Sequence, residues 1–131
     1  MNEVFIPITK VCPEKARDAR RVFPELNRIR LSVRYSPGGV NAFTCRNEVR
    51  GYYLLASPEK AKLGMICTAF GLGGKALLLE VTRRSKKRDE EACRLAEAIS
   101  PQLIAWCCDE YGLTVDPTAE IKFAAEGRFH A

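Results

Sequence analysis

The sequence contains few of the residues on which common catalytic and metal sites depend. Its single histidine, His130, is the second-to-last residue, so a Ser or Cys triad would lack a positioned base. The six cysteines include no Cys-x-x-Cys pair, and structural zinc sites need ligands paired at such short spacings. We therefore expect no catalytic residues, no metal and no cofactor. A protein that is not an enzyme is favoured, although a small enzyme of an unrecognised type stays open.

A long apolar run is also missing. A membrane-spanning helix needs about 20 consecutive apolar residues, and the candidates in this chain, such as residues 76–79, are far shorter. The first ten residues, MNEVFIPITK, carry an acid where a secretion signal carries bases. We therefore expect a cytoplasmic protein with no membrane partner, whose cysteines stay reduced.

The composition is typical of one folded domain. The chain has 131 residues, of which 47% are hydrophobic and 28% charged, as in a globular protein with one core. No internal repeat, low-complexity segment or linker divides it. We therefore expect a single domain over residues 1–131, in which the segment 117–131 packs loosely because its periodicity is weak.

Alternating patterns predict antiparallel strands in the first two thirds of the chain. The clearest is Arg28–Ser36, RIRLSVRYS, in which polar and apolar residues alternate. Glu3–Val11 predicts another strand, and Pro7 indicates that it lies at a sheet edge, because proline donates no backbone hydrogen bond. Further strands are expected at 40–46, as the hairpin partner of Arg28–Ser36, and at 49–57, 65–70 and 75–82.

The period then changes to that of a helix. Apolar residues at helical spacing predict a helix over 89–111, with the acids Asp-Glu-Glu in its first turn. Pro101 either kinks this helix or starts a second one capped by Ser100, and Gly112 is expected to end it. A short helix is expected over 13–22. The prediction is an α+β fold: an antiparallel sheet of about five strands with the C-terminal helix packed on one face.

One glycine-rich motif resembles nucleotide-binding loops. Residues 71–76, GLGGKA, match the G-x-G-x-x-A fingerprint. That fingerprint needs a helix immediately after it, whose N-terminus faces the phosphate. The residues that follow, LLLEVT, are typical of a strand. We therefore expect a hairpin turn here and no nucleotide site.

Charge is distributed unevenly along the chain. Residues 1–88 hold 18 Lys and Arg against 7 Asp and Glu, whereas residues 89–131 hold 3 against 9, and the net charge is +5. The break lies within residues 82–92, TRRSKKRDEEA, where five cations meet three acids. A chain of this kind either presents a basic surface to an acidic partner or pairs its two halves when folded. The sequence leaves both alternatives open.

The basic residues are the candidate binding site. On the strand Arg28–Ser36, three arginines share one face, and neighbouring positions on such a face lie about 6.6–6.8 Å apart, near the spacing of phosphates along a nucleic-acid strand. A helix over the opposite, apolar face would leave these arginines open, and Tyr52 or Tyr53 could add a stacking surface. The alternative is that the arginines are solvated or internally paired. The candidate residues are Arg28, Arg30, Arg34, Arg46, Arg50, Arg83, Arg84, Lys86, Lys87 and Arg88.

Three stretches, LNRIRLSVRYSPGGVN, RGYYLLASP and LLLEVTRRSKK, resemble small uncharacterised accessory proteins of mobile and conjugative elements in anaerobic Firmicutes. The resemblance covers most of the chain and implies an accessory role on such an element, with no defined activity. Together with the basic residues, it predicts a nucleic-acid-associated accessory protein that binds DNA or RNA. The alternative is a protein-interaction module or a homodimeric adaptor, with an acidic protein or a second copy as its partner.

Overall fold

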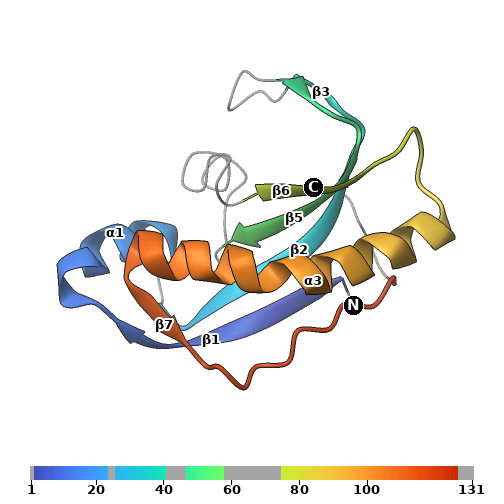
Figure 1. Ribbon diagram of the computed structural model, residues 1–131. Helices are drawn as coiled ribbons and strands as arrows, with labels where there is room; N and C mark the ends of the chain where they lie inside the picture. The colour runs from blue at the N-terminus through green and yellow to red at the C-terminus, as the bar shows by residue number, and fades with distance from the viewer. Residues whose placement is uncertain (1, 24–25, 41–46, 58–74, 127–131) are drawn as a thin grey trace.

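The structure, a computed structural model, describes residues 2–23, 26–40, 47–57 and 75–126. One antiparallel sheet has the strand order β6 (Lys75–Glu80), β5 (Gly51–Ser57), β2 (Arg28–Ser36), β1 (Glu3–Val11) and β7 (Leu113–Val115). The long helix α3 (Lys86–Tyr111) crosses one face of this sheet (Figure 1) and contacts β2, β5, β6 and β7. The α+β fold with a five-stranded antiparallel sheet and a C-terminal helix is confirmed.

The core lies between the sheet and α3. The alternation of β2 turns Ile29, Leu31 and Val33 towards the helix, where all three are fully buried. The helix contributes the small side chains Ala92, Cys93 and Ala96, together with Leu103 and Cys107. Phe123 belongs to the same core, although it lies in the segment 117–131 for which the sequence suggests loose packing. Among the described residues, no helix is both long and apolar enough to span a membrane.

The strand β1 carries Pro7 but does not lie at an edge of the sheet. Residues 3–7 pair with β2, and the following residues pair with β7. The prediction of an edge strand is therefore wrong. Proline is tolerated here because its missing N–H leaves no acceptor unsatisfied. The Pro7 carbonyl still accepts from the Asp116 N–H (3.0 Å), just beyond the end of β7. The Asp116 carbonyl, which would have faced an N–H at Pro7, accepts from the Ala119 N–H instead (3.3 Å).

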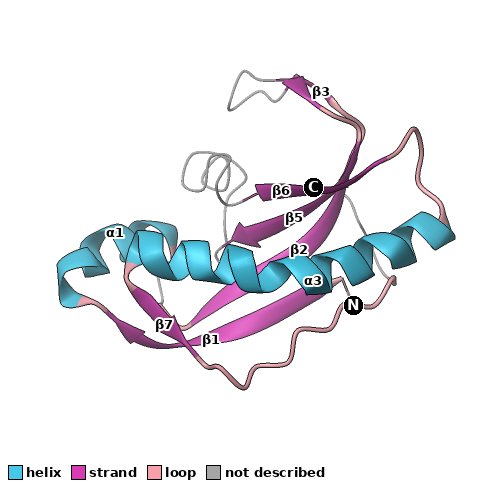
Figure 2. Cartoon of the chain, in the orientation of Figure 1, coloured by secondary structure: helices cyan, strands magenta, loops and turns pink. Residues whose placement is uncertain are grey.

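The partner of β2 also differs from the expected one. β2 pairs with β5, from Arg30 opposite Ser57 to Ser36 opposite Gly51. Between these strands, β3 (Gly39–Val40) and β4 (Asn47–Glu48) form a separate two-stranded ribbon, and β3 projects beyond the sheet in Figure 2. Of the strand expected at 40–46, Val40 pairs with Asn47 and not with β2, and residues 41–46 lie outside the described residues. The strand expected at 65–70 also lies outside them.

The helix α3 begins three residues earlier than the sequence suggests. The Ser85 hydroxyl caps it by accepting from the Arg88 N–H (3.1 Å), so the helix starts at Lys86. Pro101 lies inside the helix without ending it. Ser100 is not a cap, because its hydroxyl donates to the Ala96 carbonyl (2.7 Å).

Glycine ends this helix as the sequence predicts. Gly112 adopts the left-handed conformation, with φ of 64°, and its N–H donates to the Cys108 carbonyl. The helix expected over 13–22 is present as a 3-10 turn, η1 (Pro13–Lys15), followed by α1 (Ala16–Val22). The short strand β7, which follows Gly112 directly, was not expected from the sequence.

Candidate functional site

The arginines of β2 lie on the face opposite α3, but this face is not open. Ser32, which shares it, is only 2% exposed. The Glu3 carboxylate of β1 accepts from Arg34, with Nη2 2.9 Å from Oε1, and lies 3.9 Å from Arg30 Nη1. The Arg28 guanidinium packs over the Phe5 ring, 4.2 Å from its centroid. The open arginine surface expected from alternation is therefore wrong, because neighbouring β1 residues pair with these side chains.

The pKa of Arg34 reflects this partly buried position. Burial lowers the pKa of the Arg34 guanidinium, Glu3 raises it in opposition, and Arg30 lowers it further. The side chains of Arg30 and Arg34 are only 18% and 22% exposed. The strand arginines thus belong to an internal charge network between β1 and β2.

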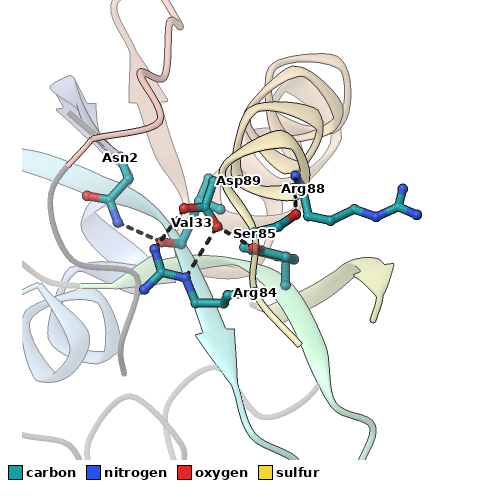
Figure 3. Close-up of polar contacts among 7 residues, drawn as sticks. Asn2, Val33, Arg84, Ser85, Arg88 and Asp89 are labelled. Atoms are coloured by element: carbon teal, nitrogen blue, oxygen red, sulfur yellow. Dashed lines mark hydrogen bonds and ion pairs between the residues drawn. The ribbon is translucent and has the colours of Figure 1, made fainter. Parts of the chain in front are cut away.

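Arg84 is also engaged within the protein. Its Nη2 lies 2.7 Å from Asp89 Oδ2, and its Nε lies 3.3 Å from Asp89 Oδ1 (Figure 3). The Tyr52 hydroxyl of β5 donates to the same carboxylate. Asp89 is 7% exposed, and Tyr52 is fully buried. A buried carboxylate needs such partners, since leaving a charge unpaired in the interior is costly.

This network raises the pKa of Tyr52 and of Arg84. Burial raises the pKa of Tyr52 to about 12, and the hydrogen bond to Asp89 acts in the same direction. The hydrogen bond to Asp89 also raises the pKa of Arg84. Tyr52 and Arg84 therefore join the start of α3 to β5 and keep fixed protonation states near neutral pH.

The remaining cations lie at exposed positions around the start of α3. Arg83, Lys86 and Lys87 are exposed. Arg88 extends away from Arg84 and Asp89 (Figure 3), and its Nη1 lies 2.7 Å from Glu91 Oε2 one turn along the helix. Such a pair at the surface is weak and leaves the guanidinium accessible.

Arg50 joins this group from β5's side of the sheet. Its Nη1 donates to the Thr82 carbonyl (2.9 Å), and its Nε donates to the Pro37 carbonyl (2.8 Å). Because Thr82 precedes Arg83, the Arg50 guanidinium lies beside the connection between β6 and α3. We name the five exposed cations of this region the junction cluster: Arg50, Arg83, Lys86, Lys87 and Arg88.

The junction cluster borders an open depression and a helix N-terminus. The depression has a volume of about 470 Å³ and is lined by Arg50, Glu80, Val81 and Thr82. Lys86 and Lys87 occupy the first turn of α3, where the helix dipole already places partial positive charge. The region is therefore suited to bind anionic groups.

Other parts of the predicted site are not brought to this region. Tyr52 and Tyr53 are buried, so the prediction that they offer a stacking surface is wrong. Arg46 lies outside the described residues. The strand β6 begins at Lys75, within the glycine-rich motif 71–76, so a strand stands where a nucleotide fingerprint requires a helix. The glycines of that motif, within residues 71–74, lie outside the described residues.

The cysteines of α3 serve the core. Burial raises the pKa of Cys93 to about 11 and that of Cys107 to about 12. Both thiols therefore stay protonated near neutral pH, and a protonated thiol is a poor nucleophile.

Sequence reasoning missed the Tyr52–Asp89–Arg84 network. The sequence pattern accounts for Asp89 as an acid in the first turn of a helix, and nothing in its local sequence indicates a partner 37 residues away on β5. The two charged halves of the chain do meet at the break itself, through Arg84 with Asp89 and Arg88 with Glu91. No protein-family model matches the chain, and no curated protein or solved structure matches it either.

Proposed function

We propose that this protein is a nucleic-acid-associated accessory protein without catalytic activity, which contacts phosphate through the junction cluster. One observation carries the proposal: five cations lie at exposed positions around one connection and the first turn of one helix. Phosphate contacts of this kind supply most of the affinity of non-specific nucleic-acid binding. The internally paired Arg28, Arg30, Arg34 and Arg84 are not part of the proposed contact surface.

The placement of the lysines supports an anionic partner. Cations in the first turn of a helix oppose the helix dipole, so Lys86 and Lys87 reduce the stability of α3 when nothing is bound. A phosphate at the same place would be attracted both by these side chains and by the positive end of the helix dipole. Residues that reduce the stability of a helix, as Lys86 and Lys87 do here, are expected where their side chains serve binding.

The proposal includes a cellular setting. The resemblance of LNRIRLSVRYSPGGVN and the two further stretches to accessory proteins of mobile elements supports a role beside nucleic acid on such an element. It also supports a cytoplasmic location, where that nucleic acid is found.

Titration of fluorescently labelled nucleic acid tests the proposal. Duplex DNA, single-stranded DNA and duplex RNA of one sequence would each be followed by anisotropy as the protein is added. For duplex DNA, five phosphate contacts predict a slope of log K against log salt of about −4 to −5. Absence of binding to all three at low salt would end the proposal.

The alternative, a protein-interaction module or homodimeric adaptor, has a separate observation in its favour. Leu77 on β6 is 44% exposed, and β6 is the outermost strand of the sheet on that side among the described strands. Exposed apolar side chains on an outer strand are a feature of interaction surfaces. Light scattering of wild type and Leu77→Asp tests it: a dimer that Leu77→Asp dissociates favours this alternative, and two monomers contradict it.

A further inference from the structure

The depression beside the junction cluster contains an acid as well as a cation. It has a volume of about 470 Å³ and is lined by Arg50, Glu80, Val81 and Thr82. Volumes of about 300–1,000 Å³ are typical of sites that hold small molecules. Glu80 is exposed, and its carboxylate forms no hydrogen bond or ion pair with any residue that the structure describes. This carboxylate is therefore free to accept hydrogen bonds from a ligand.

A close approach of β5 and β6 brings Arg50 and Glu80 to the same depression. Gly51, which follows Arg50, lies opposite Glu80 in the register of the two strands. A Cβ at Gly51 would overlap the Leu79 carbonyl oxygen, so this approach requires glycine. The Val81 N–H donates to the Arg50 carbonyl (3.2 Å) and continues the pairing beyond Glu80. The backbone of the two strands therefore fixes where both charged residues leave the sheet.

The Arg50 side chain is also held in place. Its Nη1 donates to the Thr82 carbonyl (2.9 Å), and its Nε donates to the Pro37 carbonyl (2.8 Å). A guanidinium carries five N–H donors. The Nη2 group of Arg50 makes no hydrogen bond to a described residue, so it keeps its donors for a ligand. The depression thus presents hydrogen-bond donors at a fixed place, beside the acceptors of Glu80.

Phosphate binding alone does not account for Glu80, because a carboxylate repels an anion. A carboxylate accepts hydrogen bonds from a donor, whereas a guanidinium donates them to an acceptor. A ligand that satisfies both side chains therefore presents acceptors on one edge and donors on another. Guanine is the base that matches best. Its O6 and N7 are the commonest specific partners of arginine, and its N1–H and N2 amino group donate side by side.

We propose that the depression binds a guanine base of an unpaired nucleic-acid strand. Arg50 donates to O6 and N7, and the two oxygens of the Glu80 carboxylate accept from N1–H and the N2 amino group. The guanine is unpaired because N1–H and the amino group are engaged with cytosine in a duplex. The inference rests on the proposed function, since the other four cations of the junction cluster contact the phosphates beside the base.

Titration of single-stranded DNA tests this proposal. A labelled strand of about 12 thymidine nucleotides covers one such site. Four further strands carry one guanine, hypoxanthine, adenine or cytosine at the centre, and binding is followed by anisotropy. We expect the guanine strand to bind about 5- to 100-fold more tightly than the all-thymine strand. The hypoxanthine strand, which lacks the N2 amino group, is expected to bind more weakly than the guanine strand.

The outcomes separate this inference from the proposed function. Equal binding of the guanine and all-thymine strands overturns the guanine site and leaves phosphate binding intact. Tightest binding of the adenine or cytosine strand does the same. No binding of any strand at low salt overturns both proposals. Equal binding of the guanine and hypoxanthine strands overturns the contact with Glu80, and this comparison needs only the wild-type protein.

Glu80→Gln tests the acceptor within the protein, because glutamine keeps the shape of glutamate and loses the paired acceptor oxygens. We expect the variant to bind the guanine and all-thymine strands alike. Glu90→Gln provides the matched control, since it neutralises an exposed acid of α3 outside the described lining of the depression. This control is expected to keep the preference for guanine. A preference that survives Glu80→Gln, or that both variants lose equally, overturns the proposal.

Discussion

Arg84 and Asp89, five residues apart, form a two-bond ion pair in which Nη2 lies 2.7 Å from Oδ2 and Nε lies 3.3 Å from Oδ1. Within the charged stretch at the start of α3, this pair lies in a different environment from the cations between its two members. Arg84 and Asp89 face the protein and meet Tyr52. Lys86 and Lys87 face solvent and are available to a partner. Adjacent charges in the sequence thus differ in their surroundings: Arg84 and Asp89 are held within the protein, whereas Lys86 and Lys87 are exposed.

Asp89→Ala is expected to destabilise the protein by about 2–4 kcal/mol, because it leaves the Tyr52 hydroxyl and the Arg84 guanidinium without their shared acceptor. This expected destabilisation is smaller than that for breaking a fully buried ion pair, since the Arg84 side chain is 30% exposed. Urea unfolding measures the change. The exposed neighbour Glu90 provides the control, and Glu90→Ala should stay within about 0.5 kcal/mol of wild type. Equal effects of the two substitutions would contradict the role given to Asp89.

The raised pKa of Tyr52 predicts a loss of stability in alkali. The pKa is about 12 in the folded protein, against an ordinary value of 10.0. Below pH ~10 both states keep the proton, and between pH ~10 and ~12 only the unfolded chain loses it, so stability falls by about 1.4 kcal/mol per pH unit for this group. Burial also raises the pKa of Tyr111 and Cys107 to about 12, which steepens the decline.

Tyr52→Phe isolates the contribution of this one group. Urea unfolding of wild type and Tyr52→Phe at a series of pH values would compare the two slopes. The variant should lose stability less steeply between pH ~10 and ~12, by about one proton. Parallel curves would show that Tyr52 titrates alike in the folded and unfolded states.

Gly112→Ala is expected to cost about 2–3 kcal/mol, from a strained φ and from steric overlap. A Cβ at Gly112 would lie 2.8 Å from the Cys12 Cβ and 3.1 Å from the Lys15 Cβ. Gly39 provides a matched control, because it also has a positive φ, 101°, but a Cβ there meets no described atom within 4 Å. Thermal unfolding should place Gly112→Ala well below Gly39→Ala in stability; similar values would mean that φ alone matters.

Local pattern predicted the elements of this fold well. Arg28–Ser36 and Glu3–Val11 match their predicted bounds, because alternation of period two is a property of the strand itself. Gly112 ends α3 as expected, since its left-handed conformation depends on its own lack of a Cβ. The helix α3 starts three residues before the predicted bound of 89, because the Ser85 hydroxyl caps it ahead of the cations at 86–88.

Pairings between distant residues could not be predicted in the same way. β2 pairs with β5, whereas Gly39 and Val40, at the end of the SPGG turn, pair with Asn47 and Glu48 in a separate ribbon. The candidate site changed for the same reason. Arg30 and Arg34 are withdrawn from it by Glu3 on another strand, and Arg84 by Asp89 and Tyr52. The sequence shows which residues are basic and which share a strand face, but tertiary contacts decide which of these side chains remain accessible.

Charge reversal in the first turn of α3 should stabilise the folded protein. Lys86→Glu and Lys87→Glu together replace two cations that oppose the helix dipole with two anions that it favours. We expect the free energy of unfolding to rise by about 0.3–1 kcal/mol per residue at low salt and the gain to shrink as salt is added. Thermal unfolding at two salt concentrations would measure both. A loss of stability at low salt would contradict the placement of these lysines.

The salt dependence of duplex binding by Lys86→Ala/Lys87→Ala protein is the sharpest test of the proposal that the junction cluster binds phosphate. The matched control is Arg20→Ala/Arg21→Ala, which removes two exposed cations of α1. If the junction cluster binds phosphate, the slope of log K against log salt becomes less steep by about 2 for the lysine variant and is unchanged for the control. A wild-type slope in the lysine variant, or an equal change in both variants, would contradict it.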